Sequence, residues 1–110
     1  MCSSCSDGSG GEDIYRAMHE CGTVQELYED IQNRAQDETE PDQWEVQILV
    51  RILRNFRMIL VCDEAFRKTA KEMKLETADT LEEAFKRAKE IKGETAHTVV
   101  IPDGVSVIVK

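Results

Sequence analysis

Four cysteines and two histidines are the most recognisable chemical groups in this 110-residue chain. Cys2 and Cys5 form a C-x-x-C pair, which can be redox-active at the start of a helix or can supply two zinc ligands. A redox-active pair of this kind follows a strand and begins a helix, but here one residue precedes the pair and Ser/Gly-rich sequence follows it. His19 and Cys21 could complete a four-ligand zinc site, but this spacing matches no standard zinc motif. We expect loose terminal thiols, and a zinc or redox site is the alternative.

The histidines give no sign of nucleophilic catalysis. Neither His19 nor His97 belongs to a Ser/His/Asp or Cys/His arrangement, and His97 is expected at the surface or at a sheet edge. Cys62 ends an apolar run, which favours a small buried side chain. The run Gly8-Ser9-Gly10-Gly11 could cradle phosphate through backbone N–H groups, but acidic residues flank it and no basic residue precedes Arg16. We predict no catalytic residue and no metal site in this chain.

Trp44 and three aspartates are the candidates for a binding site. Trp44 is the only tryptophan and lies near the start of an expected helix, where it could anchor the core or wall a ligand pocket. Asp63, Asp79 and Asp103 each follow an expected strand, and open α/β sheets bind ligands at such carboxyl ends. Helix capping and turn formation explain Asp63 and Asp103 equally well. The pattern alone favours a core position for Trp44.

The first half of the chain is expected to be helical after a leader. Residues 1–11 are rich in Gly and Ser and predict a flexible leader that also carries the first cysteines. A short helix over 12–20 follows, and a capping box from Thr23 to Glu26 begins a second helix. A third helix spans about 42–56, with Pro41 in its first turn. Its broad apolar stripe, with Arg51 and Arg54 on another face, consists of Trp44, Ile48, Leu49, Ile52, Leu53 and Phe56.

The second half alternates strands and helices. The expected order is a buried strand over 58–62, a helix from Asp63, a short strand over 75–78, a helix from a capping box at Thr80 to Gly93, a third buried strand over 98–101, a turn at 102–104 and a terminal strand over 105–109. We therefore predict a single α/β domain over 12–110. Helices would cover both faces of a three-layer, mostly parallel sheet that ends in a C-terminal hairpin.

Composition and charge exclude several classes of function. The net charge of −8 disfavours nucleic acid, and the longest apolar runs are too short to span a membrane. No secretory signal is visible, so a cytoplasmic location is expected. Residues 1–50 hold twelve acids and two bases, whereas 51–110 hold ten acids and twelve bases. This asymmetry is typical of solvated helix faces but also permits a surface that binds a basic partner.

Several segments, taken in order, resemble the C-terminal domain of the nickel-dependent lactate racemase family. The resemblance covers nearly the whole chain and is carried by Cys5-Ser6-Asp7-Gly8-Ser9-Gly10, by the run from Pro41 to Leu53 that leads into Ile59-Leu60-Val61, by Leu81-Glu82-Glu83-Ala84, and by Val99-Val100-Ile101-Pro102-Asp103-Gly104. Family members are about four times longer. The resemblance therefore implies a domain of a larger protein, whose preceding sheet strand would lie before Met1 and whose absence would leave a sheet edge open.

The resemblance implies racemisation of a 2-hydroxy acid with a nickel pincer nucleotide. In the family, hydride passes from the substrate to this cofactor and returns on the opposite face. The lysine and histidines that serve this chemistry belong to the N-terminal catalytic domain, and neither His19 nor His97 matches them. The expected partners are therefore that N-terminal domain and a small 2-hydroxy acid, with no nickel bound by this chain.

Trp44 is the one site residue that the resemblance carries over. It matches the tryptophan that lines the substrate and cofactor pocket in the family. An apolar wall of this kind would exclude water from the path of a hydride and hold a small ligand. The resemblance thus implies that this chain closes the active-site cleft and is inactive alone. A stand-alone acidic module that binds another protein is the alternative.

Overall fold

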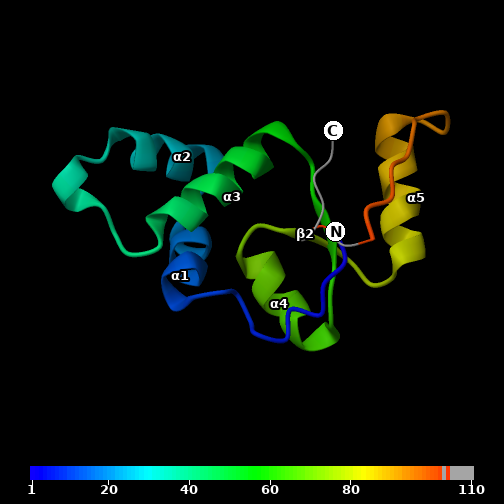
Figure 1. Cartoon of the computed structure of the whole chain (residues 1–110), viewed down its shortest axis with the longest axis horizontal. Coiled ribbons are helices and arrows are strands. Elements are labelled where there is room, and N and C mark those ends of the chain that lie inside the picture. Colours follow the sequence, from blue (N-terminus) through cyan, green and yellow to red (C-terminus); the bar gives the residue numbers. More distant parts are fainter. Residues whose placement is uncertain (103, 105–110) are drawn as a thin grey trace.

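Two groups of buried side chains organise the chain, whose computed structural model describes residues 1–102 and 104. The elements are, in chain order, α1 (Glu12–Glu20), α2 (Val24–Asn33), the 3-10 helix η1 (Gln36–Glu38), α3 (Gln43–Asn55), β1 (Ile59–Val61), α4 (Glu64–Glu72), β2 (Glu76–Ala78) and α5 (Leu81–Lys92). Figure 1 shows α1, α2 and α3 grouped at one end of the molecule and α5 at the other, with α4 and the strands between them.

The three-helix end is built on apolar residues spaced four apart. This spacing places both members of a pair on one helix face, which is then buried against the other helices. The buried pairs are Ile14 and Met18 of α1, Leu27 and Ile31 of α2, and Val46 and Val50 of α3. Met73, just after α4, joins the same cluster, so the helices pack as one unit with the α/β part.

Sequence signals locate most helix ends correctly. The Thr23 side chain accepts the Glu26 N–H, and the Glu26 carboxylate accepts the Thr23 N–H, so the predicted capping box is confirmed. Thr80 likewise caps α5, although the Glu83 carboxylate accepts the N–H of Asp79 rather than that of Thr80.

The start of α3 differs from the prediction. Asp42 is its N-cap with φ +57°, and Pro41 therefore precedes the helix instead of lying in its first turn.

The strands form a small parallel sheet that also engages the first residues of the predicted leader. β1 pairs with β2, with Leu60 opposite Thr77. On the other edge of β1, the Val61 N–H donates to the Met1 carbonyl at 2.8 Å, and the Ser3 N–H donates to the Val61 carbonyl at 3.0 Å. These bonds satisfy the Val61 backbone groups, which face away from β2. Residues 1–3 thus lie against the sheet.

Successive residues of β1 contact different helices. Leu60 is buried with Ala70 of α4, whereas Ile59 lines a hollow of about 270 Å³ with Ala84 and Phe85 of α5. The α/β class is confirmed, and the described residues form five α-helices, one short 3-10 helix and a two-stranded parallel sheet. A sheet of two short strands does not establish the predicted three layers, which stay a prediction. The predicted C-terminal hairpin involves residues 105–109, which lie outside the described residues.

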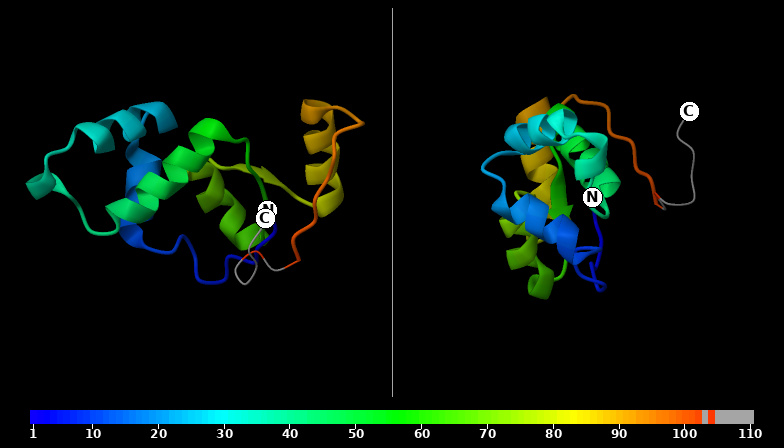
Figure 2. Two further views of the ribbon diagram at one scale, coloured as in Figure 1. Left: turned by 45° about the horizontal axis from the view of Figure 1, so that its top comes forward. Right: turned by 90° about the vertical axis from the view of Figure 1, so that its left-hand side faces the viewer.

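The third buried strand predicted over 98–101 is wrong. Among the described residues no backbone hydrogen bond joins Thr98–Ile101 to a strand, and Val100 is 80% exposed. The β2 edge gives one physical reason. The Thr77 carbonyl faces away from β1, and the Arg87 guanidinium donates to it at 3.0 Å, so a side chain occupies the place of a further strand. The segment after α5 runs apart from the other elements in the right-hand view of Figure 2.

Within the part of the chain that the structure describes, no helix has the length and apolar character needed to cross a membrane.

Candidate functional site

Trp44 lies at the surface, on the first turn of α3. Its side chain is 61% exposed, so it does not anchor the core. It lines an open hollow of about 430 Å³ between α2 and α3, together with Tyr28, Gln32, Gln47, Ile48 and Arg51. An aromatic ring, an aliphatic side chain and a guanidinium therefore meet at one place, an arrangement suited to a small ligand with both apolar and anionic parts.

The position of Trp44 depends on ties between the two helices. The Arg34 guanidinium, at the end of α2, donates to Asp30 at 2.6 and 3.0 Å, to Glu40 at 2.9 Å and to the Gln43 side chain at 3.0 Å. Burial by itself lowers the pKa of Arg34, but the hydrogen bonds to Asp30 and Glu40 outweigh it and raise that pKa above its ordinary value. Arg34 thus stays charged and fixes the start of α3 next to Trp44.

The predicted strand-end site is a second, separate hollow. Asp63 and Asp79, which follow β1 and β2, line a space of about 520 Å³ with Cys2, Ser3 and Ser4. Parallel strands bring these carboxyl ends together, as expected. The Asp63 side chain makes no capping bond to α4. Trp44 lines neither this hollow nor its rim, so the structure does not join the two candidates into one pocket. Asp103 lies outside the described residues.

Asp79 is partly neutralised at this second hollow. Its carboxylate pairs with Arg67 of α4 at 3.0 Å. The Nε atom of Arg67 is buried and has no hydrogen-bond partner among the described residues. The ion pair ties the end of β2 to α4, and Asp63 is the carboxylate of this hollow that lacks such a pair in the described part of the chain.

The histidines and cysteines do not assemble into a metal site. His19 stacks on Tyr15 with ring centroids 5.3 Å apart, and the Tyr15 hydroxyl donates to Glu72 at 2.9 Å, which raises the pKa of Tyr15. The Cys21 thiol donates to the Met18 carbonyl at 3.2 Å. Across residues 1–102 and 104, no three His, Cys, Asp or Glu side chains gather closely enough to hold a metal ion. His97 is exposed.

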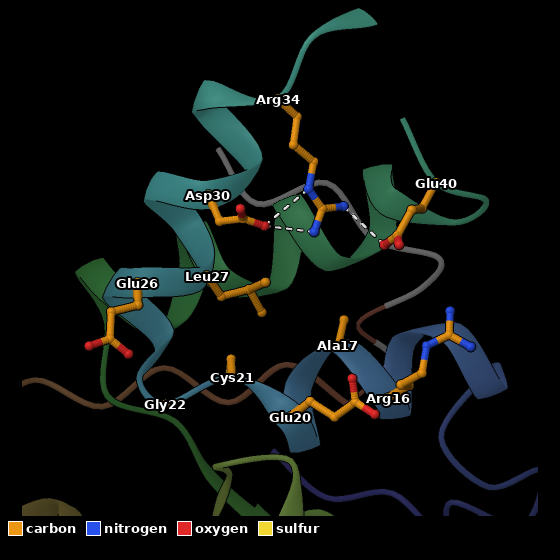
Figure 3. A pocket seen from close by; sticks show the side chains of 10 residues that line it. All are labelled: Arg16, Ala17, Glu20, Cys21, Gly22, Glu26, Leu27, Asp30, Arg34 and Glu40. Atoms are coloured by element: carbon orange, nitrogen blue, oxygen red, sulfur yellow. Dashed lines mark hydrogen bonds and ion pairs between the residues drawn. The ribbon is translucent and has the colours of Figure 1, made fainter. Parts of the chain in front are cut away.

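A cavity of about 300 Å³ between α1 and α2 was not foreseen from the sequence. Figure 3 shows the Arg34 side chain reaching between Asp30 and Glu40 at this cavity. Its nucleophile is Cys21, and burial raises the pKa of that thiol despite the opposing charge of Lys74. A thiol whose pKa is raised is a weaker nucleophile at neutral pH than an ordinary cysteine. The lining residues are Arg16, Ala17, Glu20, Cys21, Gly22, Glu26, Leu27, Asp30, Arg34 and Glu40.

By fold, the chain is a small α/β domain with a three-helix extension that presents Trp44 at its surface. Residues 1–109 match the family described as the lactate racemase C-terminal domain, and the chain belongs to this family.

Two curated relatives and one solved structure agree with this assignment. The chain is 44% identical to a lactate racemase of Thermoanaerobacterium thermosaccharolyticum and 37% identical to one of Lactiplantibacillus plantarum, in each case over 100% of this chain and 26% of the relative. The structure of the lactate racemase apoprotein from Thermoanaerobacterium thermosaccharolyticum superposes with a TM-score of 0.91 at 45% identity. That match covers 99% of this chain and 26% of the other. The chain thus spans about a quarter of the length of these relatives.

Proposed function

We propose that this chain is the C-terminal domain of a racemase acting on a 2-hydroxy acid, in which it closes the active-site cleft. The observation that carries the proposal is the exposed Trp44 on a domain whose relatives are lactate racemases. Removing a large apolar side chain from water is favourable in free energy. In the whole enzyme, other parts of the protein and the substrate would cover Trp44. The proposal includes a cytoplasmic location for the whole protein.

The proposal places the nickel site outside this chain. No three potential ligands gather in them, and the two histidines are stacked on Tyr15 or exposed. We therefore assign the nickel pincer nucleotide that the family implies to residues outside this chain. When bound, that cofactor would accept and return a hydride.

The contribution of Trp44 would be to shape and dry the pocket. Its ring, with Ile48 beside it, offers an apolar wall that keeps water from a reactive hydride path. Arg51 in the same hollow would favour an anionic ligand such as a carboxylate. None of these side chains removes a proton at neutral pH, so the acid and base of the reaction would come from other parts of the enzyme.

Substitution of Trp44 tests this proposal. In the full-length protein we expect Trp44→Ala to lower kcat/KM for racemisation at least about tenfold, which corresponds to about 1.4 kcal/mol of lost transition-state stabilisation. Leu81→Ala is the matched control, because Leu81 is also a large exposed side chain but lies on α5. Equal kcat/KM for the wild-type enzyme and the Trp44 variant would exclude this role.

Metal analysis tests the assignment of nickel. We expect the full-length protein to retain nickel and the 110-residue chain to retain none after gel filtration, as measured by elemental mass spectrometry. Stoichiometric, tightly held nickel in the isolated chain would show that the ligands lie within it, contrary to the proposed division.

A further inference from the structure

Helix α3 has two apolar faces. One face carries Val46 and Val50, which are buried against α1 and α2. The other carries Trp44, Ile48 and Ile52 at intervals of four residues, and the same spacing continues to Phe56 just after the helix. We call these four residues the α3 stripe. All four are exposed, with Trp44 at 61% and Phe56 at 70%.

Such a stripe is unusual on a free surface. Residues four apart lie on one side of a helix, and at about 1.5 Å per residue the stripe extends about 18 Å. A helix that is apolar on opposite sides is normally covered on both, because large contiguous apolar patches on soluble proteins mark contact surfaces. The other face of α3 is already covered by α1 and α2.

The polar residues of this face indicate the charge of what covers it. Arg51 shares the hollow with Trp44 and Ile48 and forms no ion pair within the described residues. An apolar centre with a basic side chain at its edge is the usual anatomy of a specific contact. The matching surface would be apolar, with negative charge only at the pocket end, where Arg51 would meet the carboxylate of the substrate.

The position of Trp44 indicates which partner covers the α3 stripe. Under the proposed function, Trp44 faces the pocket formed with the catalytic part of the protein. Ile48 and Ile52 continue from it along α3, and Phe56 follows at the C-cap of the helix. The relatives are about four times as long as this chain, so a large partner within the same polypeptide is available. We propose that the α3 stripe docks onto the preceding catalytic domain of the full-length protein, with Trp44 at the pocket end and Phe56 at the far end of the interface.

Hydroxyl-radical footprinting of the native full-length protein tests this docking with a built-in control. Phe56 is 70% exposed in this domain and Phe85, on α5, is 44% exposed, so Phe56 would react faster if the domain stood free. We expect the reverse, with Phe56 oxidised at least about threefold more slowly than Phe85, because docking onto the catalytic domain would cover the Phe56 side chain and leave Phe85 on α5 open to solvent. Faster oxidation of Phe56 than of Phe85 would overturn the proposal.

A second readout separates other occupants of the stripe. We expect the protection of Phe56 to be independent of protein concentration, because the partner is covalently linked. Protection that appears only as sedimentation shows dimers would assign the stripe to a second copy and overturn the proposal. Phe56→Asp should increase the oxidation of Ile48 and Ile52, whereas Phe85→Asp should not. An unchanged oxidation of Ile48 and Ile52 in the Phe56 variant would also contradict it.

This experiment is separable from the test of the proposed function. Footprinting reports only solvent access, so a protected stripe in a protein that racemises no 2-hydroxy acid would leave the docking standing and reject the activity. An exposed stripe in an active racemase would do the opposite.

Discussion

The four cysteines differ in how the fold surrounds their side chains. Cys2 is exposed, whereas Cys62 is 7% exposed and lies beside Leu60 and Ala70. Burial raises the pKa of the Cys62 thiol first, and the nearby Cys5 adds to the rise while Arg67 opposes it. Burial likewise raises the pKa of Cys21. Both groups therefore ionise at higher pH than an ordinary thiol.

We expect iodoacetamide at pH 8 to alkylate Cys2 first and Cys62 last. A raised pKa leaves Cys62 protonated at this pH, and burial also blocks access, so its rate should increase only at higher pH. Mass spectrometry of digested samples would follow each thiol. In urea all four should react alike, which serves as the control. Equal rates for Cys2 and Cys62 in the native protein would contradict this placement.

At the residue scale, the sequence predicted local hydrogen bonds better than exposure. The capping box at Thr23 is complete within four residues, so its pattern is visible in the sequence. The exposure of Trp44 depends on which side of α3 faces α1 and α2, and the pattern alone favoured a core position. The resemblance to the racemase family, and not the apolar pattern, is what predicts that Trp44 lines a ligand pocket. This role stays a prediction.

At the scale of elements, the cap of α2 offers a clean test of stability. Thr23→Ala removes the hydroxyl that accepts the Glu26 N–H and should lower the free energy of unfolding by about 1 kcal/mol. Urea titration followed by circular dichroism would measure this change. Thr95→Ala is the control, since Thr95 is exposed in a turn and should change stability by less than about 0.5 kcal/mol. Equal effects of the two substitutions would argue against the cap.

The predicted elements show where periodicity is sufficient and where it fails. Five helices and the two short strands occur where apolar spacing and caps placed them. The predicted strand over 98–101 has the right β-branched residues, but a strand also needs a partner, and Arg87 occupies the Thr77 carbonyl at the β2 edge. Pairing between Met1–Ser3 and β1 was missed because these segments are far apart in the sequence and the leader has no apolar alternation.

Helix α3 illustrates the same limit. The sequence showed one broad apolar stripe with Arg51 on another face. The structure instead buries Val46 and Val50, which the predicted stripe left out. Leu49 and Leu53 are half-buried, and the other four members of the predicted stripe are the exposed α3 stripe. Arg51, expected on another face, lines the hollow of Trp44. Periodicity identifies the apolar positions of a helix, but only the packed neighbours decide which of them are covered.

At the scale of the whole molecule, some side chains contact both the helical cluster and the sheet cluster of buried residues. Phe66 and Leu75 pack against both buried clusters, and Met73 belongs to the core of the three-helix end. Lys74, with φ +64°, donates to the His19 carbonyl at 2.9 Å and so links the end of α1 to the loop before β2. These contacts link the helices that carry the Trp44 surface to the sheet, as the proposed closure of a cleft would require.

The cavity of Figure 3 also emerges only at this scale. Its walls come from α1, α2 and the loop before α3, so no single sequence motif contains it. Acidic side chains there are partly neutralised by Arg34. Some of the acidic side chains in the first half of the chain therefore form ion pairs within the domain. A surface for a basic partner stays the alternative to the racemase assignment.

The racemisation of lactate by the full-length protein tests the central claim most directly. Chiral chromatography would follow one enantiomer incubated with the full-length protein and its cofactor, with the protein truncated before this domain, and with the 110-residue chain alone. We predict that the full-length protein produces an equal mixture of enantiomers and that neither part alone does so. Racemisation by the 110-residue chain alone, or undiminished racemisation by the truncated protein, would contradict the account.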